Sequence, residues 1–121
     1  MPRFVLLEHC WNGVHWDLML ETGEVLRTWA IDAPVVADAD LPARALADHR
    51  RVYLDYEGDV SGNRGTVRRI DEGVYTAVVW EEGRVRVRLE GAQLVGAVEL
   101  RQVGLRSDGG SSWIFRLGNL D

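Results

Sequence analysis

The chain has 121 residues and a formal net charge of −5 at pH 7, and 46% of its residues are hydrophobic. This length predicts a single domain over residues 1–121 with a core of its own, which excludes a disordered chain. The acidic charge excludes a protein that coats long stretches of nucleic acid. All 14 cationic side chains are arginine. This composition reflects either codon usage or a local phosphate-binding pocket. Arginine suits such a pocket because it holds phosphate through paired hydrogen bonds.

Neither a targeting segment nor an internal disulfide is expected. Cys10 is the only cysteine in the sequence, which is typical of a reducing compartment. The apolar run at residues 4–7 is too short for a signal peptide or a membrane span. We therefore expect a cytoplasmic protein that has no membrane partner.

In the first half of the chain, apolar and polar residues alternate in a way that predicts strands. Strands are expected at residues 3–9, 14–21 and 25–31, and Asn12-Gly13 supplies a tight turn between the first two. The segment 32–40 is expected to be a connector. Residues 42–49 are expected to form one short helix with Asp40 as its N-cap.

The second half begins with a loop rich in glycine and aspartate at residues 53–65. The alternation then resumes and predicts strands at 66–70, 74–80, 84–89, 94–103 and 112–117. Seven to eight short strands with at most one short helix predict an all-β fold. The expected architecture is a small, closed or nearly closed antiparallel β-barrel, because closure leaves no open sheet edge.

His9, His15 and Asp17 are the candidate metal ligands. His15 and Asp17 are two residues apart on a predicted strand, so their side chains leave the same face. A hairpin of this length returns His9 to a place beside His15. Two imidazoles and one carboxylate suit Mn²⁺, Fe²⁺, Co²⁺ or Zn²⁺ and leave positions open for water or substrate. The alternative is a pair of structural histidines, each satisfied by a hydrogen bond.

Two further segments carry candidate phosphate-binding groups. His49 follows Asp48 and precedes Arg50. A histidine at this place could contact a phosphate or act as a general acid. The alternative is an ordinary surface residue. The segment 56–65 holds three glycines and Arg64. Such a loop lets backbone N–H groups approach an anion, although an ordinary hairpin loop has the same composition.

A series of short motifs runs through nearly the whole chain in a fixed order. The motifs are His9, His15, Asp17 and Leu20-Glu21; Trp29-Ala30; Asp48-His49, Tyr53 and Tyr56-Glu57-Gly58; Gly65-Thr66-Val67; Asp71, Gly73 and Tyr75; Leu94-Val95-Gly96; and Trp113-Ile114-Phe115. In order and spacing these motifs resemble the 3′-phosphoesterase domain of bacterial DNA ligase D, which also occurs as a stand-alone protein. Many short matches in order are much more specific than any single one.

The resemblance implies a small β-barrel that trims the 3′ ends of DNA or RNA strands, removing a terminal ribonucleoside and then a 3′-phosphate. It implies that His9, His15 and Asp17 bind Mn²⁺, with Zn²⁺ or Co²⁺ as alternatives. It also implies that His49 contacts the reacting phosphate as a catalytic residue, with Tyr53 beside it. The implied partners are the 3′ end of DNA or of an RNA–DNA primer–template and a separate ligase or polymerase of end joining.

The sequence departs from the family pattern at residues that bind phosphate. Met19 stands where the family has arginine, Ala33 stands near the place of a family lysine, and the arginine upstream of the Asp-His pair is out of register. We expect Arg44, Arg50 or Arg64 to take over these contacts.

Two alternatives to an active phosphoesterase remain open. One is a binding module, a barrel that keeps its metal, has lost turnover, and recognises nucleic-acid ends or a protein partner. A third hypothesis takes His15, Asp17 and His49 as the facial triad of a non-haem iron oxygenase. That hypothesis leaves His9 without a role.

Overall fold

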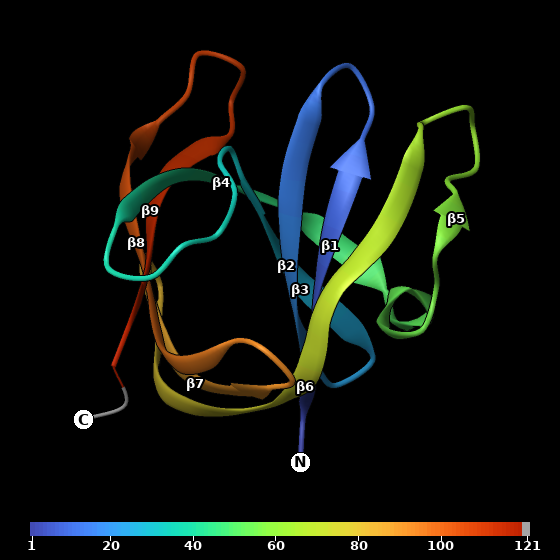
Figure 1. Cartoon of the computed structure of the whole chain (residues 1–121). Coiled ribbons are helices and arrows are strands. Elements are labelled where there is room, and N and C mark those ends of the chain that lie inside the picture. Colours follow the sequence, from blue (N-terminus) through green and yellow to red (C-terminus); the bar gives the residue numbers. More distant parts are fainter. Residues whose placement is uncertain (120–121) are drawn as a thin grey trace.

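Nine β-strands and one short 3₁₀-helix follow one another in the computed structural model, which describes residues 1–119 (Figure 1). The elements are β1 (Arg3–Cys10), β2 (Val14–Thr22), β3 (Val25–Ile31), β4 (Asp40–Arg50), η1 (Arg51–Leu54), β5 (Gly58–Asp59), β6 (Thr66–Glu81), β7 (Arg84–Gly91), β8 (Val95–Leu105) and β9 (Ser111–Gly118). The predicted all-β class is confirmed. The last two residues of the predicted domain 1–121 lie outside the described part.

Eight of these strands close into an antiparallel barrel. Their order around the sheet is β1-β2-β3-β4-β9-β8-β7-β6, and β6 pairs back onto β1. The first part of β6 pairs with β1 and its second part with β7. Residues 66–70 and 74–80, expected as two strands, are therefore one continuous strand. It changes neighbours at Gly73, which pairs with both Phe4 and Gly91.

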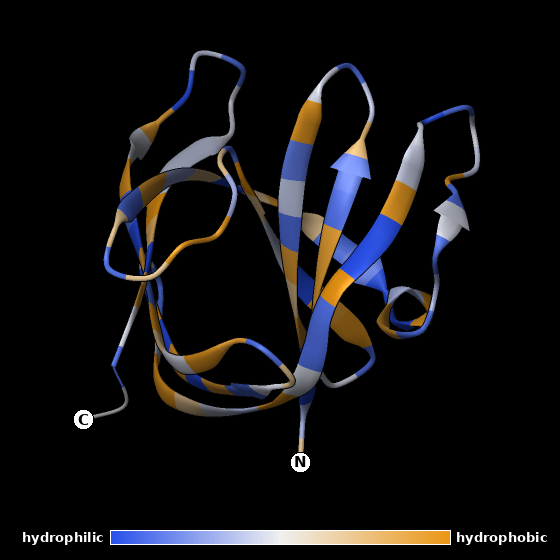
Figure 2. Cartoon of the chain, in the orientation of Figure 1, coloured by the Kyte–Doolittle hydropathy of each residue, from blue (hydrophilic) through white to orange (hydrophobic). Residues whose placement is uncertain are grey.

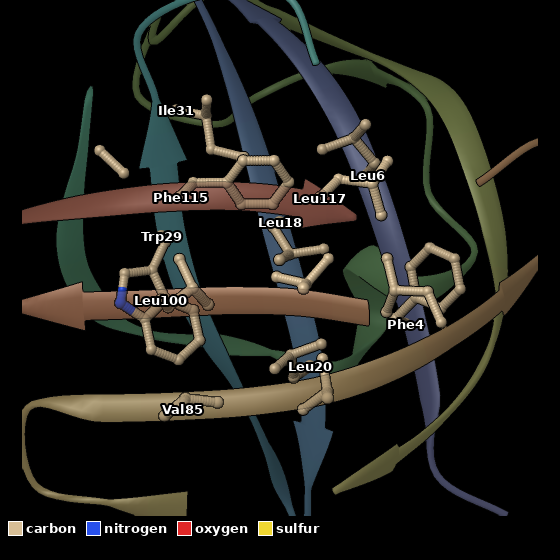
Figure 3. Packing of buried hydrophobic residues seen from close by; sticks show 14 of the residues in the cluster. Phe4, Leu6, Leu18, Leu20, Trp29, Ile31, Val85, Leu100, Phe115 and Leu117 are labelled. Atoms are coloured by element: carbon tan, nitrogen blue, oxygen red, sulfur yellow. The ribbon is translucent and has the colours of Figure 1, made fainter. Parts of the chain in front are cut away.

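Large apolar side chains fill the barrel. Figure 3 shows side chains from strands all around the wall pointing toward one another: Phe4, Leu6, Leu18, Leu20, Trp29, Ile31, Val85, Leu100, Phe115 and Leu117. The strands accordingly alternate between hydrophobic and hydrophilic residues in Figure 2. On β2, Leu18 and Leu20 are buried in this cluster and Trp16 packs against it, so these side chains face the barrel interior.

The helix predicted at residues 42–49 is wrong. This segment lies in β4, which pairs with β3 along one edge and with β9 along the other. Leu41 and Ala43 are buried while Pro42 between them is exposed, a period-two pattern that the alanine-rich composition concealed. Packing and pairing in the closed sheet override local helix propensity here. The helical turn comes later, at η1.

A second apolar cluster lies on the outer face of the barrel wall. Val5, Leu7, Met19 and Leu26 alternate with the inward residues of β1, β2 and β3. The segment from η1 to the start of β6 covers them with Leu54, Val60 and Val67. This segment therefore forms one side of any site on the outer face. Within residues 1–119, no helix is long and apolar enough to cross a membrane.

Candidate metal centre

The β1–β2 hairpin brings the predicted ligands together. His9 pairs directly with His15, and Asp17 lies opposite Leu7, one step further along the same outer face. The turn between the strands uses two left-handed residues, Asn12 with φ 53° and Gly13 with φ 114°. The backbone N–H of Trp11 donates to the carbonyl of Gly13 at 2.9 Å and closes the turn. Local turn chemistry and strand register thus create the convergence.

The three side chains meet at one point. His9 Nδ1 lies 3.4 Å from Asp17 Oδ2, and His15 Nε2 lies 3.1 Å from Asp17 Oδ1. One donor atom from each residue lies within 4.8 Å of the other two. Bonds of about 2.0–2.2 Å to a single ion require donor atoms within about 4.4 Å of one another, so small side-chain rotations suffice.

Asp17 is the buried charge of this cluster. The residue is 1% exposed, and its Oδ1 atom accepts no well-aligned hydrogen bond among residues 1–119, although His15 Nε2 lies 3.1 Å away. Burial by itself raises the pKa of the Asp17 carboxyl, but the two adjacent histidines outweigh burial and hold its pKa below the usual value. A buried carboxylate is stabilised by a nearby positive charge. The donor set and this orphaned oxygen both fit a divalent ion of the imidazole–carboxylate class.

His9 is oriented from behind by a backbone carbonyl. Its Nε2 atom lies 2.8 Å from the carbonyl oxygen of Arg64. A carbonyl only accepts, so Nε2 carries the hydrogen and the other ring nitrogen, Nδ1, faces Asp17. Metal-binding histidines are commonly held by such a contact. The sequence contained no signal for this contact.

The same hairpin tip packs tightly against Gly65. A Cβ atom at Gly65 would lie 1.9 Å from the carbonyl oxygen of Cys10, and the glycine has φ 81°. Only glycine fits both this space and this backbone conformation. The glycine-rich loop is therefore more than a hairpin connection, because it packs against the hairpin that carries the candidate ligands.

A cavity of about 400 Å³ opens beside the three ligands. Every residue predicted for the site lines it: His9, His15, Asp17, Arg44, His49, Arg50, Tyr53 and Arg64. The register brings Arg44 to the ligands, because Asp17 pairs with Ala30 and Ala30 pairs with Arg44 across three adjacent strands. Trp11, which the sequence analysis did not select, also lines the cavity. The only feature of the sequence that pointed to Trp11 was a large aromatic residue beside a tight turn.

His49 stands apart from the metal cluster but within the cavity wall. Its Nδ1 lies 2.8 Å from the carbonyl of Ala47 and so donates to it. Nε2 is then the ring nitrogen left for a ligand. The Tyr53 ring meets the His49 ring edge-on with centroids 5.8 Å apart. Among the described residues, the convergent cluster contains His9 and not His49, which disfavours the facial triad of an iron oxygenase.

The three cavity arginines differ in how they are held. Arg44 donates to Asp32 Oδ1 at 3.2 Å, and Arg64 Nε donates to the carbonyl of Ser61 at 2.8 Å. Arg50 is exposed and makes no ion pair or side-chain hydrogen bond within residues 1–119. Met19, by contrast, is buried in the outer apolar cluster and gives the cavity an uncharged floor.

Two comparisons with known proteins bear on this site. Residues 7–102 match the family model of the DNA ligase D 3′-phosphoesterase domain. The "Multifunctional non-homologous end joining protein LigD" of Pseudomonas aeruginosa is 27% identical over 114 residues. That match covers 86% of this chain but only 14% of the Pseudomonas protein.

Proposed function

The chain belongs to the DNA ligase D 3′-phosphoesterase domain family, and we propose that it is a metal-dependent phosphoesterase acting on 3′ ends of DNA and RNA strands. Its reaction would remove a terminal 3′-ribonucleoside, which leaves a 3′-phosphate, and would then remove that phosphate, which leaves a 3′-hydroxyl. The similarity to an end-joining protein supports a role in end-joining DNA repair, beside a separate ligase or polymerase. The acidic net charge suits an enzyme that grips one end rather than a long duplex.

The observation that carries this proposal is the buried Asp17 carboxylate, which lies between two histidines at the wall of a cavity lined with arginines. His9, His15 and Asp17 would hold the metal, for which we propose Mn²⁺, with Zn²⁺ or Co²⁺ as alternatives. A divalent ion bound there supplies Lewis acidity toward a phosphoryl oxygen and lowers the pKa of water.

The remaining residues would bind and orient the phosphate. In its charged form, His49 would donate Nε2–H to a phosphate oxygen while its Nδ1–H donates to the carbonyl of Ala47. Arg50 makes no competing ion pair within the described residues. Arg44 must release its hydrogen bond to Asp32, and Arg64 its hydrogen bond to Ser61, before either can bind a phosphate. Tyr53 fixes the His49 ring by its edge-on contact. Preorganised charges of this kind stabilise the negative charge that develops during phosphoryl transfer.

The direct test incubates the purified protein and Mn²⁺ with a primer–template that ends in a 3′-phosphate or in one 3′-ribonucleotide. We expect the 3′-phosphate end to become a 3′-hydroxyl that a polymerase can extend. The ribonucleotide end should be shortened by one nucleoside to a 3′-phosphate and then converted to a 3′-hydroxyl. An Asp17→Asn variant is the matched control, since it keeps the shape of the side chain and removes its charge. Full metal binding without conversion of either substrate would contradict the proposed activity.

A binding module is the second candidate. The apolar floor made by Met19, where the family pattern has a phosphate-binding arginine, is the observation that favours it. In that case the protein would bind a 3′-phosphate end in the presence of metal and leave it intact. Anisotropy measurements with the same labelled primer–template separate the two functions.

A further inference from the structure

Trp11 presents a large aromatic ring at the edge of the metal centre. The residue is 45% exposed although it lines the cavity. Its ring lies roughly parallel to the His9 ring, with centroids 6.2 Å apart and planes 20° from parallel. It follows β1 at the tip of the β1–β2 hairpin, which lies at the top of the barrel in Figure 1.

The main chain of Trp11 is held firmly while its ring stays open. The backbone N–H is bonded to the Gly13 carbonyl at 2.9 Å. The Cβ atom lies only 2.8 Å from where a Cβ on Gly65 would be, so the loop backbone packs against it. Trp11 belongs to neither apolar cluster. An exposed aromatic ring on a firmly held backbone, outside both apolar clusters and beside a ligand site, is suited to stacking on another flat ring.

The two sides of the metal ligands differ chemically. His49 pairs with Leu26 of β3, and Leu26 pairs with Glu21 of β2. Glu21 lies four residues after Asp17 along β2, so His49 is displaced from the ligands in that direction. Trp11 lies in the opposite direction, beyond His9 and toward the hairpin tip. His49, Tyr53 and Arg50 lie on one side of the ligands, whereas the exposed aromatic ring of Trp11 lies on the other side, beside the loop that carries Arg64.

A nucleotide at a 3′ end has the same two-sided chemistry. Its phosphate is anionic and its base is a flat aromatic ring. Resting on the proposed phosphoesterase function, we propose that Trp11 is the stacking platform for the base of the terminal nucleoside that carries the scissile 3′-phosphate. Trp11 thereby selects nucleic-acid ends over other phosphate esters. Because every base has a π-face, this contact favours a base over no base and tolerates any sequence.

The test compares two labelled oligonucleotides that end in a 3′-phosphate, one with a normal terminal base and one with an abasic terminal residue. Affinity is measured by fluorescence anisotropy in Mn²⁺, and KM and kcat are measured in parallel. The variants are Trp11→Ala and Trp11→Phe. Trp80→Ala is the matched control, because Trp80 is an exposed tryptophan of β6 that does not line the cavity.

Trp11→Ala should weaken binding of the normal end by about 5- to 150-fold, the range for loss of one base–aromatic stack. It should leave binding of the abasic end unchanged, and Trp11→Phe should restore most of the difference. Equal losses on both ends would overturn the proposal, since Trp11 would then act through His9. No loss on either end would also overturn it. A wild type that neither binds nor converts 3′-phosphate ends refutes the proposed function and this inference together, whereas wild-type activity without base dependence refutes the inference alone.

Discussion

The Nε2 atom of His9 and the carbonyl oxygen of Arg64 lie 2.8 Å apart. This contact joins the first strand of the barrel to the glycine-rich loop that precedes β6. It fixes which ring nitrogen of His9 carries hydrogen and leaves Nδ1 toward Asp17 at 3.4 Å. The loop therefore takes part in the candidate metal centre through its backbone, while the side chain of Arg64 lines the cavity.

Truncating any one of the three ligands should abolish stoichiometric Mn²⁺ or Zn²⁺ binding. His9→Ala is the sharpest case, because the facial-triad hypothesis does not use His9. Titration calorimetry should show no metal binding by this variant and normal binding by His49→Ala, whose side chain lies outside the cluster. Full metal occupancy in His9→Ala would show that another set of residues holds the ion.

Replacing Gly65 by alanine should weaken both the metal site and the fold. The added Cβ would clash with the carbonyl of Cys10 at 1.9 Å, so the loop must retreat and withdraw the Arg64 carbonyl from His9. Loss of a contact behind a metal ligand typically lowers metal affinity about 10- to 100-fold. Gly104→Ala is the control, since a Cβ there meets nothing within 4 Å. Equal metal affinities in the two variants would show that the loop does not influence metal binding.

Metal binding should weaken as the pH falls, because a proton and the metal compete for His9 Nδ1. The hydrogen bond to Asp17 is the main reason why the pKa of His9 is raised above its ordinary value. His9 therefore keeps its proton to a higher pH than an ordinary histidine does. This proton is released when the metal binds. Calorimetry in two buffers of different ionisation enthalpy should detect this proton release. Metal affinity that stays constant from about pH 5 to 8 would contradict the assignment.

Removing one phosphate contact should slow turnover by about 10²- to 10³-fold and leave metal binding intact. We expect this result for His49→Ala and for Arg64→Ala on the 3′-phosphate substrate. Arg44→Ala and Arg50→Ala extend the comparison to the other two cavity arginines. Arg101→Ala, an exposed arginine of β8 away from the cavity, controls for the change in net charge. Undiminished rates in both His49→Ala and Arg64→Ala would overturn the roles proposed for them.

Leu18→Ala should destabilise the barrel by about 2–5 kcal/mol, because Leu18 is buried in the filled interior and its loss leaves a cavity. Val103→Ala, at a side chain that is 56% exposed, should change the free energy of unfolding by less than about 0.5 kcal/mol. Urea unfolding of both variants provides the comparison. Equal unfolding midpoints would mean that Leu18 does not contribute to a packed interior.

The sequence by itself determined the features that depend on local patterns. Period-two alternation located most strands, and the spacing of His15 and Asp17 placed them on one face of β2. The Asn12-Gly13 turn set the register that pairs His9 with His15. The ordered motifs identified the family, since each residue type reports a local requirement of the shared fold.

Only the tertiary structure decided what depends on neighbours distant in sequence. The segment around Ala43 favours helix locally, yet it is a strand because β3 and β9 pair with both its edges. The contact between His9 and the Arg64 carbonyl joins residues far apart in the chain, and a backbone carbonyl leaves no mark in residue identity. Trp11 is an unremarked turn residue in the sequence and a cavity wall in the fold. Pairing and packing across a closed sheet, which no local window contains, account for all three.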